Sequence, residues 1–317
     1  MKKIVTIINP VSGTTSKKKI PELFNRLIPS EEFEKEFLFS EYHGHAFELA
    51  GKAVEQRADY VIAVGGDGTV NEVAKALVNS DSALGIVPMG SGNGLARDLS
   101  IPLDVHGALD VILEHNIASI DYCKANDNIF FCTCGVGFDA LISQRFAEEK
   151  RRGYFTYLKN IVHEYFKFKP EAYKIEFETG ETVNIKAFLV TCANASQYGN
   201  NAYIAPLAEM NDGLIDVAVV VPFNSWDIIG MAFQMFTKQL TKNPKAHYYK
   251  AKKLTVTRQQ AGIVHLDGEP VALENPVTIE VFHSGLKVLA PLNPLPQVYD
   301  VPSLFDYIYK WSKKKRP

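Results

Sequence analysis

The sequence has 317 residues, 46% of them hydrophobic and 22% charged, so it is long enough for two domains that each bury a core. The 34 lysines and arginines nearly balance the 36 aspartates and glutamates, and the formal net charge of −2 excludes a global positive field that would recruit nucleic acid. No window approaches the ~18 uninterrupted apolar residues that a membrane-spanning helix requires.

The first 120 residues alternate short apolar runs with stretches of helical periodicity. The apolar runs predict strands at residues 3–9, 37–40, 60–64 and 84–87. Between them, apolar residues recur at the helical spacing around residues 20–28, 46–53 and 70–78. Thr69 and Glu72 have the spacing of a capping box, which predicts that the third helix begins near Val70. Strands alternating with helices predict crossover connections and a largely parallel sheet covered on both faces.

After residue 120 the pattern changes to strands and turns. A hairpin signal at residues 125–128 separates predicted strands at 119–124 and 129–134, and Gly180 separates predicted strands at 173–179 and 182–192. Further strands are predicted at 214–221, 253–258, 262–266 and 277–282, and helical stretches around 140–168 and 225–240. We therefore predict a three-layer α/β nucleotide-binding domain with a mostly parallel sheet over residues 1–120 and a β-sandwich with helical insertions over 121–290. Residues 291–317 are expected to pack back on the first domain.

Three glycines, Gly65, Gly66 and Gly68, lie between the carboxyl end of a predicted strand and the amino end of a predicted helix. Backbone N–H groups and the positive end of the helix dipole favour an anion there, and the missing Cβ atoms let phosphate oxygens approach the backbone. Asp67 would repel that phosphate unless a divalent metal or a proton to be removed offsets its charge, which is typical of a catalyst. The alternative is a tight turn whose geometry an aspartate favours.

The same strand-and-turn design occurs twice more, at residues 7–13 after the first strand and at residues 86–94 after the fourth. Each turn places small and hydroxyl residues at the carboxyl edge of the predicted parallel sheet. Ligands of open α/β sheets bind at this edge. Three such turns in one domain predict a nucleotide site.

In this order, the turns resemble the diacylglycerol kinase catalytic-domain family, which includes bacterial lipid kinases, sphingosine kinases and ceramide kinases. The motifs are Asn-Pro-x-Ser-Gly at residues 9–13, Gly-Gly-Asp-Gly-Thr-x-Asn-Glu at 65–72 and Pro-x-Gly-Ser-Gly-Asn at 88–93, and the resemblance continues through 206–214, 266–270 and 285–289. The central motif alone also occurs in NAD kinases and phosphofructokinases. The resemblance implies an α/β nucleotide domain joined to a β-sandwich, the NAD kinase and diacylglycerol kinase type of fold.

The resemblance implies an ATP-dependent lipid kinase that uses Mg²⁺ and transfers the γ-phosphate to a hydroxyl of a membrane lipid, with diacylglycerol as the first candidate. Many bacterial diacylglycerol kinases have an acid directly after the third-turn asparagine, where this chain has Gly94, so a sphingoid base or ceramide stays an alternative. Remoter alternatives are an NAD kinase-like phosphotransferase and a non-catalytic nucleotide- or lipid-binding regulator. Pure binding needs no set of acids such as Asp67, Asp267 and Glu269 near phosphate, which argues against the regulator.

Two acids are implied as catalytic. Asp67 would organise magnesium and the acceptor hydroxyl, and Glu269, in the turn at residues 266–270, would act as general base. Some members of the family assign the base to the residue that matches Asp67, so both remain catalytic candidates. Ser40 is a nucleotide candidate by position alone. The residues implied on the nucleotide side are Asn9, Ser12, Gly13, Ser40, Gly65, Gly66, Asp67, Gly68, Thr69, Val70, Asn71, Ser91 and Asp267.

A structural magnesium site is implied by the resemblance alone, with the side chain of Asp212 and the backbone oxygens of Glu209 and Leu214 as ligands. Without the resemblance, this stretch predicts a turn. Asn93 and Asp139 are implied on the side of the acceptor lipid. Basic residues between 145 and 152 are implied to face the phosphates, and the alternative for each is a solvated helix face.

The remaining features concern location and partners. Each of the eight histidines is predicted to be satisfied or to face solvent, and the four cysteines, which form no Cys-x-x-Cys pair, favour a reducing, intracellular setting. Aromatic residues at 304–311 precede a basic cluster at 313–316, which predicts an interfacial anchor or, alternatively, a docked terminal helix with a frayed basic end.

We expect a cytoplasmic protein peripheral at the inner face of the membrane, a lipid substrate at the membrane surface and no nucleic-acid partner. A homodimer is left open.

Overall fold

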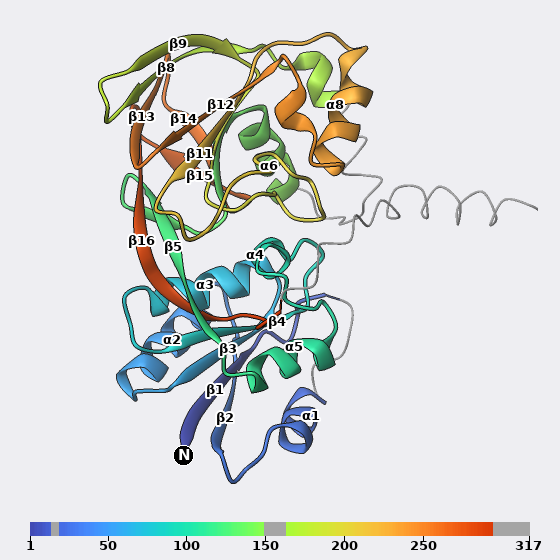
Figure 1. Cartoon of the computed structure of the whole chain (residues 1–317), viewed down its shortest axis with the longest axis vertical. Helices are drawn as coiled ribbons and strands as arrows, with labels where there is room; N and C mark the ends of the chain where they lie inside the picture. The colour runs from blue at the N-terminus through green and yellow to red at the C-terminus, as the bar shows by residue number, and fades with distance from the viewer. Residues whose placement is uncertain (14–18, 149–162, 294–317) are drawn as a thin grey trace, which may run out of the picture.

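The computed structural model describes residues 1–13, 19–148 and 163–293, and Figure 1 shows two lobes stacked along its long axis. In the first lobe, four parallel strands lie in the order β2-β1-β3-β4, as the alternating pattern predicted. All residues of β3 and β4 are buried, which is why both read as continuous apolar runs. The elements are β1 (Lys2–Ile8), α1 (Ile20–Leu27), β2 (Phe33–Phe39), α2 (His45–Glu55), β3 (Tyr60–Gly65), α3 (Asp67–Leu77), β4 (Ala83–Pro88), α4 (Gly94–Asp98) and α5 (Val105–Leu113).

Helix α3 begins earlier than the sequence predicted. Its first residue is Asp67, and only Gly66 separates it from β3. The predicted capping box is wrong, because no side chain caps α3 and Glu72 lies too far along the helix to do so. The Glu72 carboxylate instead accepts hydrogen bonds from the backbone N–H groups of Gly44 at 2.9 Å and Ala46 at 3.1 Å, so it caps the neighbouring helix α2.

The second lobe is a β-sandwich, as predicted. One sheet has the order β12-β11-β10-β7-β14-β15, and the facing strands β5, β6, β8, β9, β13 and β16 belong to the sheet that continues from the first lobe. Apolar residues of both sheets, including Cys123, Cys134 and Cys192, form the core between them, while α6 and α8 pack on the other face of the six-stranded sheet. The elements are β5 (Ile117–Ala125), β6 (Asn128–Phe130), β7 (Thr133–Gly137), α6 (Phe138–Glu148), β8 (Glu171–Phe177), β9 (Thr182–Ala187), β10 (Leu189–Ala193), β11 (Ile215–Val220), α8 (Asp227–Phe236), η1 (Leu240–Lys242), β12 (Ala246–Ala251), β13 (Lys253–Arg258), β14 (Gly262–Leu266), β15 (Glu269–Leu273) and β16 (Val277–Leu289).

Two long strand predictions in this lobe are wrong, because each run crosses from one sheet to the other. Residues 129–134 divide between β6 and β7, and the N–H groups of Phe131 and Cys132 between them donate to the carboxylate of Asp267. Residues 182–192 divide at Phe188 into β9 and β10. Strands β12 and β15 were not predicted. Strand β15 begins with the exposed Glu269 and with Pro270, so it lacks the alternation of apolar residues that predicts a strand. Proline is tolerated there because β15 lies at the edge of its sheet.

Strand β16 passes through both lobes (Figure 1). Its first part pairs antiparallel with β13, most of its length pairs with β5, and Val288 pairs in parallel with Leu84 of β4. The register with β5 shifts between Phe282 and Leu286. A single sheet of ten strands therefore runs from the nucleotide-type lobe into the sandwich.

The end of the described chain contacts the first lobe. The N–H of Ala290 donates to the carbonyl of Asn116 at 3.1 Å, and the N–H of Leu292 donates to the Glu114 carboxylate at 2.7 Å. Residues 294–317, with the predicted interfacial anchor, lie outside the described residues, as do Lys150, Arg151 and Arg152. Within the described ranges, no helix is both long and apolar enough to cross a membrane.

Candidate functional site

The three predicted turns lie together at the carboxyl edge of the parallel strands. The Asn9 amide donates to the hydroxyl oxygen of Thr69 at 2.9 Å, which joins the first turn to the second. The N–H of Met89 donates to the carbonyl of Gly65 at 2.7 Å, which joins the third turn to the second. Ser40 lies at the end of β2, buried, with its N–H on the carbonyl of Ile8 at 3.0 Å.

The second and third turns touch through their backbones. A Cβ atom on Gly90 would lie 2.7 Å from the Cα of Gly66, so position 90 does not accept a larger residue without separating the turns. Asn93 closes the third turn with a backbone in the left-handed region, at φ of 51°. Its side-chain amide accepts from the N–H of Gly90 at 2.9 Å and donates to the carbonyl of Gly90 at 3.0 Å. Ser91 is exposed beside this closed turn. The predicted contact of Asn93 with the acceptor stays a prediction.

The predicted nucleotide residues differ in what they offer. The side chain of Val70 is buried and its N–H donates to the carbonyl of Gly66 at 3.1 Å. Thr69 is also buried, and its hydroxyl keeps a hydrogen to donate after accepting from Asn9. In the first turn, Ser12 donates to the carbonyl of Asn9 at 3.1 Å, and Gly13 is exposed.

Asp67 is held by the third turn. Its Oδ2 accepts from the N–H of Asn93 at 2.9 Å, and its Oδ1 accepts from the N–H of Gly94 at 2.6 Å. A Cβ on Gly92 would lie 2.8 Å from Oδ2, so the glycine leaves room for the carboxylate. Asp67 is only partly buried, and each oxygen retains a lone pair beyond the one bonded to N–H. This oriented, solvent-reaching carboxylate fits a hydrated Mg²⁺.

Glu269 reaches the same place from the second lobe. It is the exposed first residue of β15, and its Oε1 lies 3.3 Å from the position that a Cβ on Gly68 would take. Gly68 follows Asp67 directly, so the Glu269 carboxylate of the second lobe lies at the amino end of the helix that carries Asp67. Within the described parts of the chain, the Glu269 side chain forms no hydrogen bond or ion pair, which leaves both of its oxygens able to accept a proton.

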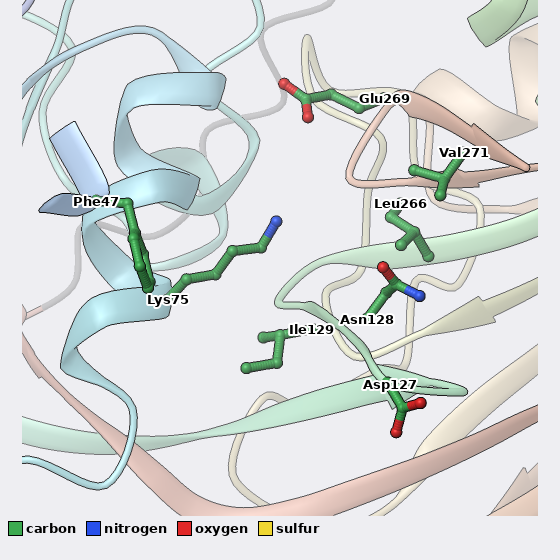
Figure 2. Close-up of a pocket in the computed structure, with 8 residues that line it drawn as sticks. All are labelled: Phe47, Lys75, Asp127, Asn128, Ile129, Leu266, Glu269 and Val271. Carbon is green, nitrogen blue, oxygen red and sulfur yellow. The ribbon is translucent and has the colours of Figure 1, made fainter. Parts of the chain in front are cut away.

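A cleft of about 360 Å³ opens between the lobes beside Glu269. This volume lies within the range of small-molecule sites. Figure 2 shows Lys75 and Glu269 extending into the cleft from opposite sides. Lys75 was not predicted, although it lies on α3 at the helical spacing from Gly68 and Asn71, both of which face the second lobe. The lining residues are Phe47, Lys75, Asp127, Asn128, Ile129, Leu266, Glu269 and Val271.

Asp267, predicted on the nucleotide side, joins the lobes. Its carboxylate accepts from the N–H groups of Phe131, Cys132 and Thr133 at 2.7 to 3.0 Å and from the amide of Asn71, on α3, at 2.6 Å. Burial raises the pKa of Asp267, and the three backbone donors oppose that rise. Four N–H donors already surround this carboxylate, so its contribution to the site is the placement of Glu269 two residues later.

We expect Asp267→Asn to lower the free energy of unfolding by about 2–4 kcal/mol, because an amide nitrogen would face N–H donors that lose their acceptor. Urea unfolding followed by circular dichroism measures the change. Asp127→Asn, at the exposed tip of the β5–β6 hairpin, is the matched control. Equal stability of both variants would contradict the role of Asp267 as a link between the lobes.

Asp139 lies in a buried polar cluster of the second lobe. Its Oδ2 accepts from the hydroxyl of Thr191 at 2.7 Å, and lies 3.1 Å from both the hydroxyl of Tyr198 and Nε2 of His265. Its predicted contact with a lipid head group stays a prediction.

His265 is buried, and within the described chain its Nδ1 has no hydrogen-bond partner, so the prediction of a satisfied or solvent-facing histidine is wrong for this ring nitrogen. Arg145, implied to face phosphates, pairs instead with Glu148 at 3.2 Å and Glu164 at 3.5 Å.

At the implied structural magnesium site the Asp212 carboxylate is engaged with the protein, and the site stays a prediction. Oδ1 of Asp212 accepts from the N–H of Leu214 at 2.9 Å, and Oδ2 accepts from the ammonium of Lys250 at 2.9 Å. The same ammonium lies 3.2 Å from the buried carboxylate of Asp216. Over the described ranges, no three His, Cys, Asp or Glu side chains gather as metal ligands, whereas the implied site would use one carboxylate and two backbone oxygens. A lysine supplies the positive charge here.

Replacing Lys250 with methionine should lower the free energy of unfolding by about 1–3 kcal/mol at neutral pH, because the buried Asp216 loses its cation. Burial raises the pKa of Asp216, and the Lys250 ammonium opposes that rise. In the variant the pKa of Asp216 should rise further. The loss of unfolding free energy is therefore full above that raised pKa, where Asp216 is charged. It shrinks as pH falls through the pKa, because the protonated acid needs no cation.

Urea unfolding of Lys250→Met over a range of pH tests this expectation. Lys174→Met, which removes an exposed partner of Glu176, is the control. A loss that stays constant down to acidic pH, or one that Mg²⁺ repairs, would contradict the assignment of the ammonium as the stabilising cation.

The diacylglycerol kinase catalytic domain matches residues 3–125, and the YegS C-terminal NAD kinase beta sandwich-like domain matches residues 132–290. A diacylglycerol kinase of Staphylococcus saprophyticus is 29% identical over 274 residues, which cover 83% of this chain and 87% of that protein. A Chromohalobacter salexigens protein named "Probable lipid kinase YegS-like" is 31% identical over 238 residues, covering 73% of this chain and 76% of the other.

Solved structures share the fold. A diacylglycerol kinase from Bacillus anthracis has a TM-score of 0.72 at 21% identity, over 92% of this chain and 97% of that one. An NAD kinase from Archaeoglobus fulgidus in complex with ATP has a TM-score of 0.52 at 15% identity, over 95% of this chain and 97% of that one. These likenesses agree with the NAD kinase and diacylglycerol kinase type of fold that the sequence predicted.

Proposed function

Because the chain belongs to the diacylglycerol kinase catalytic-domain family of bacterial lipid kinases, we propose that it transfers the γ-phosphate of ATP to the hydroxyl of diacylglycerol in a membrane. One observation carries the proposal. Glu269 of the second lobe reaches Gly68, the residue that follows Asp67 at the amino end of α3, beside the cleft between the lobes. Phosphoryl transfer requires such positioning and charge compensation more than covalent help from the protein.

The three turns would hold the nucleotide. The first N–H groups of a helix have no partner within it, and at the start of α3 they point to the edge where the turns meet. Glycine at 66 and 68 lets phosphate oxygens reach that backbone. Magnesium, bound with ATP, would neutralise charge that develops on the phosphates. Lys75, on the same helix, would add a positive charge to the cleft.

The two acids would have different tasks. Each oxygen of Asp67 already accepts a backbone N–H, which fixes the orientation of the carboxylate. Asp67 is therefore suited to orienting the metal and the acceptor. Glu269 has neither oxygen engaged within the described chain, so we assign to it the removal of the proton from the attacking hydroxyl.

Labelled ATP, magnesium and vesicles that contain diacylglycerol test the proposal, with labelled lipids separated by thin-layer chromatography. Parallel reactions contain monoacylglycerol, sphingosine, ceramide or NAD. We expect labelled phosphatidic acid. Labelled sphingoid or ceramide phosphate would move the acceptor to the alternative that Gly94 leaves open, and labelled NADP alone would overturn the assignment as a lipid kinase.

A further inference from the structure

Helix α8 (Asp227–Phe236), with its N-cap Trp226, has two apolar faces. One face packs on the core of the second lobe, through the buried Met231 and the partly buried Met235. The other faces solvent, where Trp226 is 94%, Ile229 81%, Phe233 58% and Phe236 36% exposed. At 100° per residue these four side chains occupy about 80° of the helix circumference, so they form one continuous stripe.

A neighbouring segment extends this surface. The ring of Tyr165 lies 5.4 Å from that of Phe223, and its hydroxyl donates to the carbonyl of Phe223 at 3.0 Å, three residues before Trp226. The next residue, Phe166, is 67% exposed. Single exposed hydrophobic residues are common on soluble proteins, but five large ones gathered over two adjoining segments mark an interaction surface. Figure 1 shows α8 at the end of the second lobe remote from the first.

Charge indicates what this surface binds. Exposed lysines flank it on both segments, at Lys167 and Lys169 before it and at Lys242 and Lys245 after it. None of the four forms an ion pair within the described parts of the chain. The acid of α8, Asp227, accepts from the N–H of Asn224 at 3.0 Å and so caps its own helix. An apolar stripe bordered by lysines complements a bilayer with anionic head groups.

We propose that the solvent-facing stripe of α8, with Phe166, docks the enzyme on an anionic membrane surface. The four aromatic and aliphatic side chains of α8 enter the boundary between head groups and acyl chains, and the lysines contact lipid phosphates. The inference deepens the proposed function, since it names the surface through which a kinase with a membrane-embedded acceptor reaches its substrate layer. Binding to the membrane requires neither ATP nor turnover, so the two are measured separately.

Tryptophan fluorescence tests the contact directly. The chain has two tryptophans, and Trp311→Phe leaves Trp226 as the single emitter. With vesicles of phosphatidylcholine and phosphatidylglycerol, and without ATP, we expect the emission to shift to shorter wavelength and to be quenched by brominated acyl chains. Unchanged emission from protein that co-sediments with the vesicles would overturn the proposal, because the contact would then lie elsewhere.

Vesicle binding by variants completes the test. The double variant Ile229→Glu, Phe233→Glu should partition about tenfold or more weakly, because two charges enter the apolar boundary, whereas Leu103→Glu, at an exposed apolar residue of the first lobe, should bind as the wild type does. Raised salt should weaken binding of the wild type several-fold. Full binding by the double variant, or a wild-type dimer that it abolishes without effect on vesicle binding, would overturn the proposal.

The design separates failure of docking from failure of the proposed reaction. If wild-type protein binds vesicles through Trp226 but phosphorylates no lipid, the docking surface stands and the proposed function falls. If the double variant loses activity on diacylglycerol in vesicles but keeps it on a short-chain, water-soluble diacylglycerol, both stand.

Discussion

Asp67→Asn should lower kcat by about 10³-fold, a loss in the range measured when one preorganised charge-stabilising group is removed, while the Kd of a non-hydrolysable ATP analogue changes by less than about tenfold. The substitution removes the negative charge that orients magnesium beside the transferred group. The phosphates would still meet the backbone of the glycine-rich turn, so binding of the nucleotide is retained.

A second effect of Asp67→Asn follows from the third turn. The carboxylate accepts one N–H on each oxygen, from Asn93 and Gly94, and an amide has only one oxygen to replace them. We expect a stability loss of about 1–2 kcal/mol in addition to the catalytic loss. Kinetics with vesicle substrate, calorimetric titration with the analogue and urea unfolding separate the three quantities. Asp81→Asn, which removes a fully exposed charge at the opposite end of β4 from the third turn, is the control. A variant with near-full rate would refute the role of Asp67.

Glu269→Gln should lower kcat by about 10²–10⁴-fold, the contribution typical of a general base. Glutamine keeps the size and polarity of the side chain but cannot take the proton from the acceptor hydroxyl. Because Glu269 is exposed and forms no contact that stabilises the fold within the described chain, the unfolding free energy should hardly change. The readout is kcat over a wide pH range together with thermal unfolding.

The pH profile distinguishes a base from a positioning residue. Loss of the base removes the limb of the profile that rises with deprotonation of the carboxylate, and higher pH does not restore the rate of the variant. Recovery at high pH would show that another group takes the proton. Glu274→Gln, an exposed acid on the same lobe, should leave the profile unchanged. Glu269→Asp, which shortens the side chain by one methylene, should keep part of the rate, because the base persists at a less favourable distance.

The parallel strands and their turns could be predicted because their causes are local. Strands β3 and β4 are buried along their whole length and therefore consist of apolar residues, and the turns after them need glycine where backbones or carboxylates approach closely. The sandwich was predictable in outline for the same reason. The crossings at Phe131 and Phe188 were not, because an apolar run that changes sheets has the same composition as one that continues.

Residue roles that depend on distant partners could not be predicted from local spacing. Glu72 has the spacing of a capping residue for its own helix, yet its partners Gly44 and Ala46 precede it by more than 20 residues in sequence. Asp267 was predicted on the nucleotide side, and its spacing gave no sign that the donors to its carboxylate come from residues 131–133 and from Asn71. Lys75 is a different case, since its helical spacing from Gly68 and Asn71 was a signal that could have been used.

The path of β16 has a consequence for how the protein folds and moves. Its residues leave the ribosome after every other helix and strand that the structure describes, yet Val288 completes the flank of β4, so the sheet of the first lobe cannot be completed until the second lobe has been synthesised. Halves expressed separately would each expose a bare strand, and heating should melt the whole molecule in one cooperative step. If the halves rotate relative to one another, we expect the motion to be a twist of this shared ribbon at the irregular pairing between Phe282 and Leu286.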